Sequence, residues 1–277
     1  HTGLNCHLKF KPLDCNSGIV FKRIDLKNAP EILVDIDNIL DTKRGTSIIQ
    51  NNCSVYTVEH LLAAIMGLQI DNILIEISNK ELPILDGSSI PFVNILNSAG
   101  IFEQELYCKE IVINDSIKCL NSENNSEIYV IPSEEFKITY VIEYDHESIG
   151  KQEVELHDLK KEFVKEFAPA RTFCLLSEVK SMRNGGLIKG ASIKNSLVFL
   201  DNCDNSNQLF ELKNLFKIKT ELFRGNNGIL NGIKLRYFNE PVRHKVLDLL
   251  GDLALLGAPI KGHIFAKRSG HKTNIEL

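Results

Sequence analysis

Apolar positions in the first hundred residues follow two spacings, the alternation typical of strands and the three-to-four spacing typical of helices. Strand-like segments rich in β-branched residues are 18–26, 31–40 and 71–78. Helix-like segments are 54–68 and, after a turn at Asp86–Gly87, 88–100. Ser54 or Thr57 could cap the first of these helices. This part of the chain therefore predicts a sheet packed against helices.

The second half of the chain repeats this order. Strand-like segments are 127–133, 136–144, 186–200 and 260–271, the last of which runs into a loop. Helix-like segments are 158–170 and 241–256. The Asn-rich segment 201–232 interrupts the pattern, and we interpret it as a surface excursion rather than a functional lid. Strands followed by helices, twice over, predict an α+β fold of two similar α/β sandwich domains, residues 1–105 and 106–277.

One helix carries polar residues among its leucines. In "PVRHKVLDLLGDLALLG", residues 241–257, His244, Asp248 and Asp252 follow one another at four-residue spacing and share a face. A buried carboxylate is costly without a metal or a cation beside it. His and Asp at positions i and i+4 suit a nitrogen and an oxygen ligand of one zinc ion. The alternative is a solvated acidic edge with a hydrogen-bonded histidine.

Glu59 and His60 stand side by side in the apolar segment "TVEHLLAA". With His60 as a third ligand, the set would be two histidines and one aspartate with one open position, which is typical of a catalytic zinc. Glu59 lies about 100° around the helix from His60 and could take a proton from water. The H-E-x-x-H spacing of metalloproteases is absent, which argues against a thermolysin-like site.

The other histidines differ in their surroundings. His271 lies in the Ser-Gly segment "RSGHKTN", where we expect a loop whose imidazole is mobile enough to meet a substrate. The alternative for His271 is an ordinary surface histidine. We expect His7, His146 and His157 on the surface because their neighbours are polar, and His263 packed within an apolar strand.

Composition narrows the class of protein. With 43% hydrophobic and 25% charged residues, the 277-residue chain can bury a sizeable core. The net charge of −4 argues against a nucleic-acid-binding protein, and no apolar run is long enough to predict a membrane span. The seven cysteines lack C-x-x-C spacing and predict the reduced thiols of a cytoplasmic protein. The chain opens at "HTGLN" without a methionine, which we take as a sign of a missing N-terminal piece.

Seven motifs, in order along nearly the whole chain, resemble those of the UDP-3-O-(3-hydroxyacyl)-N-acetylglucosamine deacetylases of lipid A biosynthesis. They are "HTGL", "TVEHLLAA", "IDNILIEI", "ELPILDGSSIPFV", "ARTF", "EPVRHKVLDLLGDLALLG" and "SGHKTNIEL". The resemblance implies zinc-dependent release of acetate from an acylated UDP-N-acetylglucosamine, a small-molecule substrate. It also implies that both sandwich domains are ribosomal protein S5 domain 2-like, and we expect a cytoplasmic monomer.

The resemblance assigns chemistry to the residues singled out above. It implies that zinc, or iron(II) in the same site, is held by His60, His244 and Asp248. Glu59 falls where the family has its general base. His271 falls where the family has a protonated histidine that stabilises the oxyanion and protonates the leaving amine. Whether Glu59 also carries out the second proton transfer stays open.

Further positions match residues that support this chemistry. Asp252 matches the residue that keeps His271 charged, and Thr172 in "ARTF" matches a hydroxyl that donates to the oxyanion. Lys245 matches a cation that faces carbonyl or diphosphate oxygens of the substrate. The segment 183–195 matches the insert that surrounds the acyl chain. The substrate-binding residues that the resemblance implies are Lys245, Phe173, His1 and Gly190.

The chain also departs from the family pattern. The family's first strand would precede residue 1, the segment 201–232 is longer than expected, and the sequence stops soon after "NIEL". The first two departures motivate a second hypothesis, a catalytically silent relative that acts as a binding or scaffold protein, although every residue that the chemistry needs is present. A third hypothesis, a nucleic-acid-binding module, disagrees with the net charge.

Overall fold

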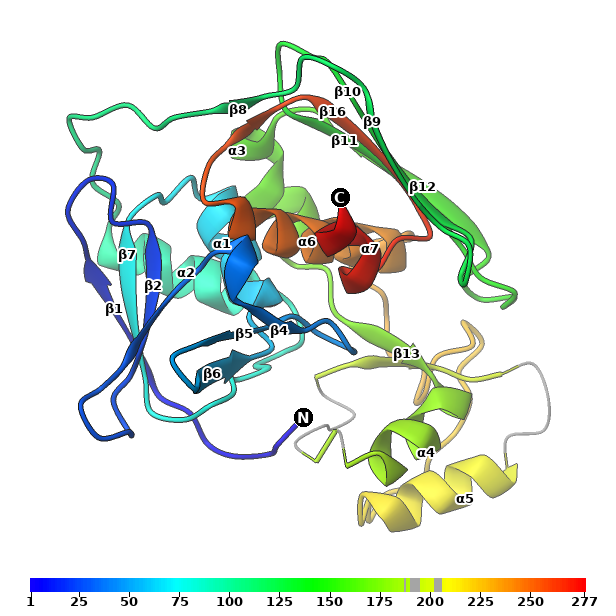
Figure 1. The fold of residues 1–277 in the computed structure, drawn as a ribbon. Coiled ribbons are helices and arrows are strands. Elements are labelled where there is room, and N and C mark those ends of the chain that lie inside the picture. The colour runs from blue at the N-terminus through cyan, green and yellow to red at the C-terminus, as the bar shows by residue number, and fades with distance from the viewer. Residues whose placement is uncertain (187, 190–194, 202–205) are drawn as a thin grey trace.

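Two β-sheets with helices between them form an α+β structure, as the sequence predicts (Figure 1). The structure is a computed structural model and describes residues 1–186, 188–189, 195–201 and 206–277. The four strands of the first sheet are β1 (Leu8–Pro12), β2 (Ile19–Arg23), β3 (Glu31–Leu33) and β7 (Ile73–Ile77). The five strands of the second sheet are β9 (Ile117–Asn121), β10 (Ser126–Ile131), β11 (Lys137–Glu143), β12 (Lys151–Leu156) and β16 (His263–Lys267).

The two sheets have related pairing patterns. The first has the order β1-β7-β2-β3, and its parallel pair β2–β7 is flanked by antiparallel strands. The second has the order β12-β11-β16-β10-β9, and its parallel pair β11–β16 is likewise flanked by antiparallel strands. In β7, Ile73, Ile75 and Ile77 are buried and alternate with the half-buried Leu74 and Glu76. Each strand can therefore turn one face toward the helices.

The helices and the smaller sheets complete the structure. The α-helices are α1 (Glu59–Gly67), α2 (Ile90–Ala99), α3 (Leu159–Glu162), α4 (Leu176–Asn184), α5 (Ser206–Leu215), α6 (Glu240–Leu253) and α7 (His271–Glu276). A π-helical segment (Phe163–Phe167) continues α3, and short 3₁₀ turns are η1 (Ile36–Asn38) and η3 (Ala254–Leu256). The small sheets are formed by β4 (Ile39–Asp41), β5 (Ser47–Gln50) and β6 (Cys53–Tyr56), by β8 (Ile111–Val112) and β15 (Ile260–Lys261), and by β13 (Phe173–Leu175) and β14 (Leu197–Phe199).

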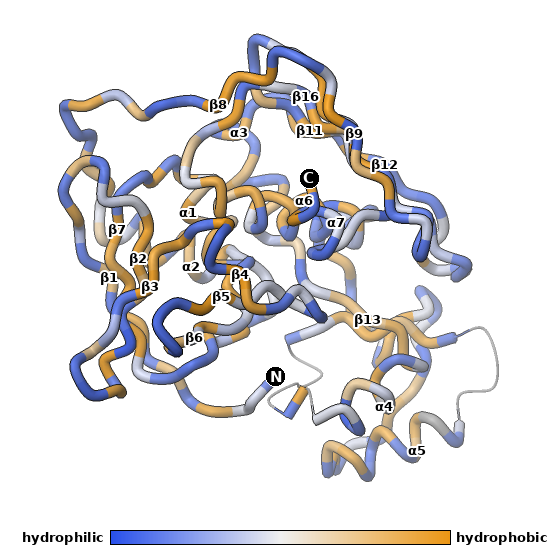
Figure 2. Tube along the Cα trace, in the orientation of Figure 1, coloured by the Kyte–Doolittle hydropathy of each residue, from blue (hydrophilic) through white to orange (hydrophobic). Residues whose placement is uncertain are grey.

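The hydrophobic core surrounds α1 and α6, which pack against each other. Leu61 and Leu62 of α1 and Leu249 and Leu250 of α6 have no exposed surface. Full burial of a leucine side chain is worth about 1.5–3 kcal/mol, so this helix pair is held firmly. Figure 2 shows hydrophobic residues concentrated along α1, β2 and β7, while the connecting loops are more hydrophilic. Within the described part of the chain, no helix combines the length and the apolar character that crossing a membrane requires.

A glycine sets how closely the two central helices approach. A Cβ atom at Gly251 of α6 would lie 2.2 Å from the backbone oxygen of Glu59 in α1. Any larger residue would therefore push the first turn of α1 away from α6. Because Glu59 and His60 occupy that first turn, the close approach places them beside the polar face of α6.

Several boundaries differ from the sequence prediction because turns interrupt the expected segments. The expected strand 31–40 is broken after β3, where the Asp35 side chain accepts a hydrogen bond from the Asp37 N–H and stabilises η1. The expected helix 54–68 begins later, because Cys53–Tyr56 pairs with β5 as a strand. Thr57 has a φ of 59°, and neither Ser54 nor Thr57 caps α1, which begins at Glu59.

The segment 201–232 contains α5, which lies with α4 at one end of the molecule (Figure 1). Phe210 of α5 is exposed, as expected of a surface excursion. Leu212, however, is buried in a second apolar cluster with Val179 of α4 and Val198 of β14. The segment therefore also contributes an apolar side chain to this second cluster.

Candidate metal centre and active site

Three candidate metal ligands converge from two helices. His60 is the second residue of α1, and His244 and Asp248 lie one turn apart on α6. Their ligand atoms all lie within 4.8 Å of one another, and all three residues are buried. Asp248 Oδ1 lies 3.4 Å from His244 Nε2 and 3.9 Å from His60 Nε2. Residues from distant parts of the sequence thus face one point.

The protonation of the two histidines suits metal binding. Burial lowers the pKa of His60 to about 3 and also lowers the pKa of His244, so both imidazoles are neutral and offer lone pairs. His244 Nδ1 donates a hydrogen bond to the Ala170 carbonyl at 3.0 Å, which directs its Nε2 toward the ligand cluster. Two neutral imidazoles and one carboxylate therefore form a donor set that fits a divalent metal ion.

Lys245 keeps the third ligand ionised. Burial alone would raise the pKa of Asp248, but the Lys245 ammonium, 2.8 Å from Asp248 Oδ2, holds that pKa well below its usual range. The same ion pair raises the pKa of Lys245 although burial acts to lower it. Lys245 also lines a second cavity of about 240 Å³, together with Arg268 and Ser269. Glu143 lines the same cavity and pairs with Arg268 at 2.7 Å, so a cavity with charged groups of both signs adjoins the metal centre.

Glu59 is a buried carboxylate beside the metal ligands. Only 4% of its surface is exposed, and the Thr46 N–H donates to its Oε2 at 3.0 Å. Burial raises the pKa of Glu59 to about 7, an increase that the positive charge on His271 partly offsets. A carboxylate with a pKa near neutrality can both accept and release a proton at physiological pH.

His271 is held more firmly than the sequence predicts. The expectation of a mobile loop is wrong, because His271 is the first residue of α7 and its side chain is 12% exposed. Its Nδ1 donates to Asp252 Oδ2 at 2.9 Å, and Asn274 Nδ2 donates to the same oxygen at 2.7 Å. Burial would lower the pKa of His271, but the charge and hydrogen bond of Asp252 raise it to about 9. A half-buried imidazolium is therefore available as an acid.

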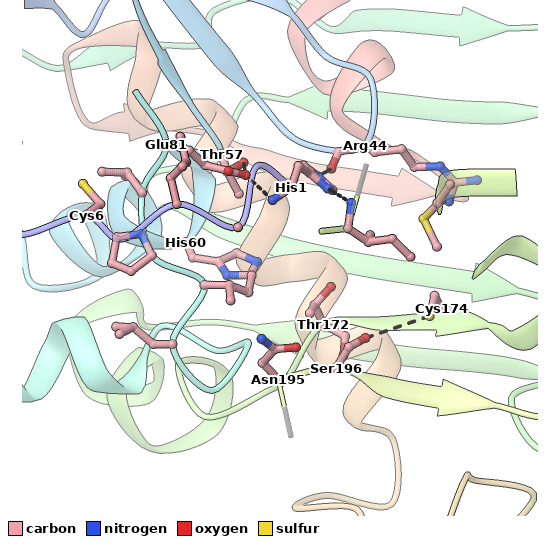
Figure 3. A pocket seen from close by; sticks show the side chains of 18 of the residues that line it. His1, Cys6, Arg44, Thr57, His60, Glu81, Thr172, Cys174, Asn195 and Ser196 are labelled. Carbon is pink, nitrogen blue, oxygen red and sulfur yellow. Dashed lines mark hydrogen bonds and ion pairs between the residues drawn. The ribbon is translucent and has the colours of Figure 1, made fainter. Parts of the chain in front are cut away.

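A cavity of about 530 Å³ reaches the site, with His60 and Thr172 in its lining (Figure 3). Glu59, His60 and Thr172 line one part of it, and Phe173 follows Thr172 along the wall. Apolar side chains around α4, α5 and β14 also line the cavity: Val179, Met182, Ile188, Val198, Leu212 and Phe216. Polar chemistry and an apolar chamber thus share one cavity.

Thr172 is fixed by the chain on both sides. Its N–H donates to the Gly87 carbonyl at 2.7 Å, and its carbonyl accepts from the Leu197 N–H at 2.9 Å. Gly87 has a φ of +84°, and a Cβ there would lie 2.3 Å from the Asn195 backbone oxygen. The turn at Gly87 therefore has no room for a side chain, and its carbonyl holds Thr172 in place. Thr172 lies in the wall of the cavity (Figure 3).

Of the other expected substrate-binding residues, one lines the larger cavity, one lines the second cavity and one lies outside the described residues. His1 lines the cavity, and its Nε2 donates to the Arg44 carbonyl at 3.1 Å. Lys245 faces the second cavity described above. Gly190 and part of the segment 183–195 lie outside the described residues, so their expected role stays a prediction.

One histidine was misplaced by sequence reasoning. His146 is buried rather than on the surface, because its Nε2 donates to the Leu200 carbonyl at 3.0 Å and its ring packs edge-on against Phe199. Its polar sequence neighbours hid this tertiary contact. His263 is half-buried, and its Nε2 lies 2.9 Å from Thr139 Oγ1. Its ring packs on Phe265, in line with the expected packing role.

Sequence reasoning also missed two residues that contact the site. Thr46 donates a hydrogen bond to Asp252 Oδ1 and Asn274 donates one to Asp252 Oδ2. Asn274 lies three residues after His271 and shares its side of α7, but the expectation of a loop there concealed that spacing. Thr46, in the segment "KRGTSI", had no detectable signal.

The sequence is similar to a known protein family along its whole length. The model of the LpxC family, described as UDP-3-O-acyl N-acetylglycosamine deacetylase, matches residues 1–216 and 211–277. The chain is 47% identical to a bifunctional enzyme LpxC/FabZ of Chlorobaculum tepidum, over 100% of this chain and 60% of that protein. It is 37% identical to a protein of the same name from Porphyromonas gingivalis, again over 100% and 60% of the two chains.

A further relative carries a single activity in its name. The chain is 36% identical to a UDP-3-O-acyl-N-acetylglucosamine deacetylase of Syntrophus aciditrophicus, over 100% of this chain and 79% of that protein. The chain thus spans about 60% of the two bifunctional relatives and more of this one. From the match along its whole length, the chain belongs to the UDP-3-O-acyl N-acetylglycosamine deacetylase family.

Proposed function

We propose that this chain hydrolyses the N-acetyl group of UDP-3-O-(3-hydroxyacyl)-N-acetylglucosamine, giving the free amine and acetate, the committed step of lipid A biosynthesis. The observation that carries the proposal is the meeting of three buried candidate metal ligands, a buried carboxylate and a hydrogen-bonded histidine–aspartate pair beside a partly apolar cavity. Membership of the deacetylase family supports the same reaction and a UDP-sugar substrate.

Zinc is the metal that we assign to His60, His244 and Asp248, and iron(II) suits the same donor set. A Zn²⁺ ion in this site supplies Lewis acidity, which polarises an amide carbonyl and makes a water molecule more acidic. The low pKa values of the two histidines and the ionised Asp248 keep the three ligands ready to bind it.

The protein's own groups carry the proton transfers. Glu59 accepts a proton from the water whose oxygen bonds to the acetyl carbon. The Thr172 hydroxyl and the His271 imidazolium donate hydrogen bonds to the oxyanion that forms on the substrate. His271 then gives its proton to the nitrogen as the carbon–nitrogen bond breaks, so that a neutral amine leaves. Asp252 keeps the imidazole oriented and charged.

The cavities suggest how the substrate lies. The 3-hydroxyacyl chain occupies the apolar part of the larger cavity, past Phe173 and the segment that includes Gly190, with His1 at the cavity wall. The Lys245 ammonium faces the diphosphate or the carbonyl oxygens. The two related sheets support a division into sandwich domains at residues 1–105 and 106–277, and we infer a monomer that works in the cytoplasm.

Changing His271 to glutamine is expected to remove the alkaline limb of the pH profile. The proposed acid must be protonated, so the wild-type rate falls as the pH rises through the His271 pKa of about 9. Glutamine cannot titrate, and losing the acid lowers the rate by roughly 10²–10⁴-fold. Measuring kcat/KM from pH 6 to 10 tests this expectation. An alkaline limb unchanged in the variant would assign it to another group, and His157→Gln, on the exposed surface, serves as the control.

Shortening Phe216 to alanine is expected to admit longer acyl chains. Phe216 lines the apolar part of the cavity, whereas Phe210 in the same segment is 67% exposed and does not. Each added methylene that becomes buried is worth about 0.8 kcal/mol, or roughly fourfold in kcat/KM. Comparing substrates of increasing acyl length for F216A and the matched F210A variant tests the assignment. An identical length preference in both variants would place the acyl chain elsewhere.

The reaction itself is tested by following amine and acetate together. Metal-loaded protein is incubated with UDP-3-O-(3-hydroxymyristoyl)-N-acetylglucosamine, and both products are quantified. We expect equal amounts of the two, with UDP-N-acetylglucosamine, which has no acyl chain to fill the cavity, reacting far more slowly. Metal-loaded protein that releases neither product would contradict the proposal and favour a binding role.

A further inference from the structure

Thr46 lies directly before β5, beside the helices that carry the active site. It is fully buried, and its polar groups are all hydrogen-bonded. The backbone N–H donates to Glu59 Oε2 at 3.0 Å, and the backbone carbonyl accepts from the Val58 N–H at 3.0 Å. The hydroxyl donates to Asp252 Oδ1 at 2.5 Å. Thr46 therefore contacts both the proposed base and the carboxylate behind the proposed acid.

The direction of the hydroxyl hydrogen bond is determined by its partners. An ionised carboxylate can only accept, so the single hydroxyl hydrogen of Thr46 goes to Asp252. Asp252 also accepts from His271 Nδ1, at 2.9 Å to Oδ2, and from Asn274 Nδ2 at 2.7 Å. The Thr46 oxygen lies 3.2 Å from His271 Nδ1 as well. Donors on both oxygens prevent the carboxylate from rotating, and through it they orient the imidazole.

The backbone before Thr46 is shaped to reach Glu59. Gly45 has a φ of +152°, and a Cβ there would lie 3.0 Å from Glu59 Oε1. The loop therefore passes directly against the carboxylate and presents the Thr46 N–H to its second oxygen. Glu59 comes from α1, while Asp252 and His271 come from α6 and α7, so Thr46 joins groups from separate helices.

We propose that Thr46 is a positioning residue, which fixes Glu59 and the Asp252–His271 pair relative to each other. Glu59 is thereby placed to take a proton from water, and His271 is placed to deliver one to the amine. This inference rests on the deacetylation proposed above. Base and acid must act on the two sides of one scissile bond, so an error in their separation affects turnover more than substrate binding.

Two substitutions separate this role from simple filling of space. Thr46→Val keeps the shape and the backbone N–H but removes the hydroxyl, and Thr46→Ser keeps the hydroxyl. We expect T46V to lower kcat by about 10–100-fold, an effect of the size found when hydrogen-bonded partners of metal ligands are removed. KM and metal content are expected to stay at wild-type values, and T46S is expected to recover kcat to within a few-fold. If T46V does not fold, Thr46→Ala removes the same hydroxyl and leaves only a small void.

The outcomes distinguish the inference from the proposed function. Wild-type protein that releases no amine contradicts the proposed deacetylation itself. Active wild-type protein with unchanged kcat in T46V or T46A overturns the role of Thr46 alone. An equal loss in T46V and T46S, or a loss that follows metal content, also overturns it, because either result indicates a structural role.

A readout independent of turnover tests the same contact. In the folded, metal-loaded protein, the His271 Nδ1 proton is expected to give a protected nuclear magnetic resonance signal in wild type and T46S. We expect that signal to broaden by exchange with water in T46V, because Asp252 Oδ1 then loses the Thr46 donor that restrains it and the carboxylate is held mainly through Oδ2. An equally protected proton in T46V would contradict the proposal even if wild-type turnover were absent.

Discussion

Replacing Glu59 by glutamine is expected to leave the metal in place and lower kcat by roughly 10²–10⁴-fold, the usual contribution of a general base. Glutamine has nearly the same shape and can still accept from the Thr46 N–H, but it cannot take a proton from water. Burial raises the pKa of Glu59 to about 7, so the carboxylate is the group in this site best matched to that proton transfer.

The measurement for Glu59 is kcat with metal content determined on the same sample. Glu155→Gln is the matched control, because Glu155 lies on β12 and its side chain is 51% exposed. A Glu59→Gln variant that keeps its metal and turns over within tenfold of wild type would show that the base lies elsewhere. Loss of metal in that variant would instead give Glu59 a role in holding the ion.

Replacing Asp248 by alanine is expected to abolish metal retention. The change removes the anionic ligand of the set and leaves the Lys245 ammonium buried without its partner at 2.8 Å. Loss of an outer partner of a ligand costs about 10–100-fold in metal affinity, so loss of the ligand itself is expected to cost more. The unpaired lysine is expected to lower the free energy of unfolding by about 3–5 kcal/mol.

Dialysis against a metal buffer followed by metal analysis measures the first effect, and urea unfolding measures the second. Asp115→Ala, at an exposed position outside the site, controls for loss of an aspartate in general. Full metal content in the Asp248→Ala variant would remove Asp248 from the ligand set. Unchanged stability would show that Lys245 reaches solvent once its partner is gone.

The polar stripe of α6 shows what local sequence can predict. Helical spacing placed His244, Asp248 and Asp252 on one face among leucines, and the structure has them buried on that helix. Periodicity also located β2, β3 and β7 of the first sheet and β10, β11 and β16 of the second, but it missed β1, β9 and β12. The meeting of His60 with this stripe depends on the packing of α1 on α6, which spacing within one helix does not contain.

Other features arise from contacts between distant residues. Thr46 reaches Asp252 across 206 positions of sequence, and its own neighbours carry no signal of that contact. His146 is buried by β14 and the residue that follows it, although its sequence surroundings are polar. His271 follows a Ser-Gly pair that is typical of a loop, yet Asp252 and Asn274 hold it at the start of a helix. Tertiary hydrogen bonds outweigh the local pattern at each of these positions.

The most direct test of the central claim follows one sample of the wild-type chain through metal removal and restoration. Amine release from UDP-3-O-(3-hydroxymyristoyl)-N-acetylglucosamine is measured before chelation, after chelation, and after addition of zinc in steps up to one equivalent. We predict that activity disappears with the metal and returns in proportion to the zinc bound. Full activity in the metal-free protein, or zinc bound to the intact site with no amine release, would contradict the account.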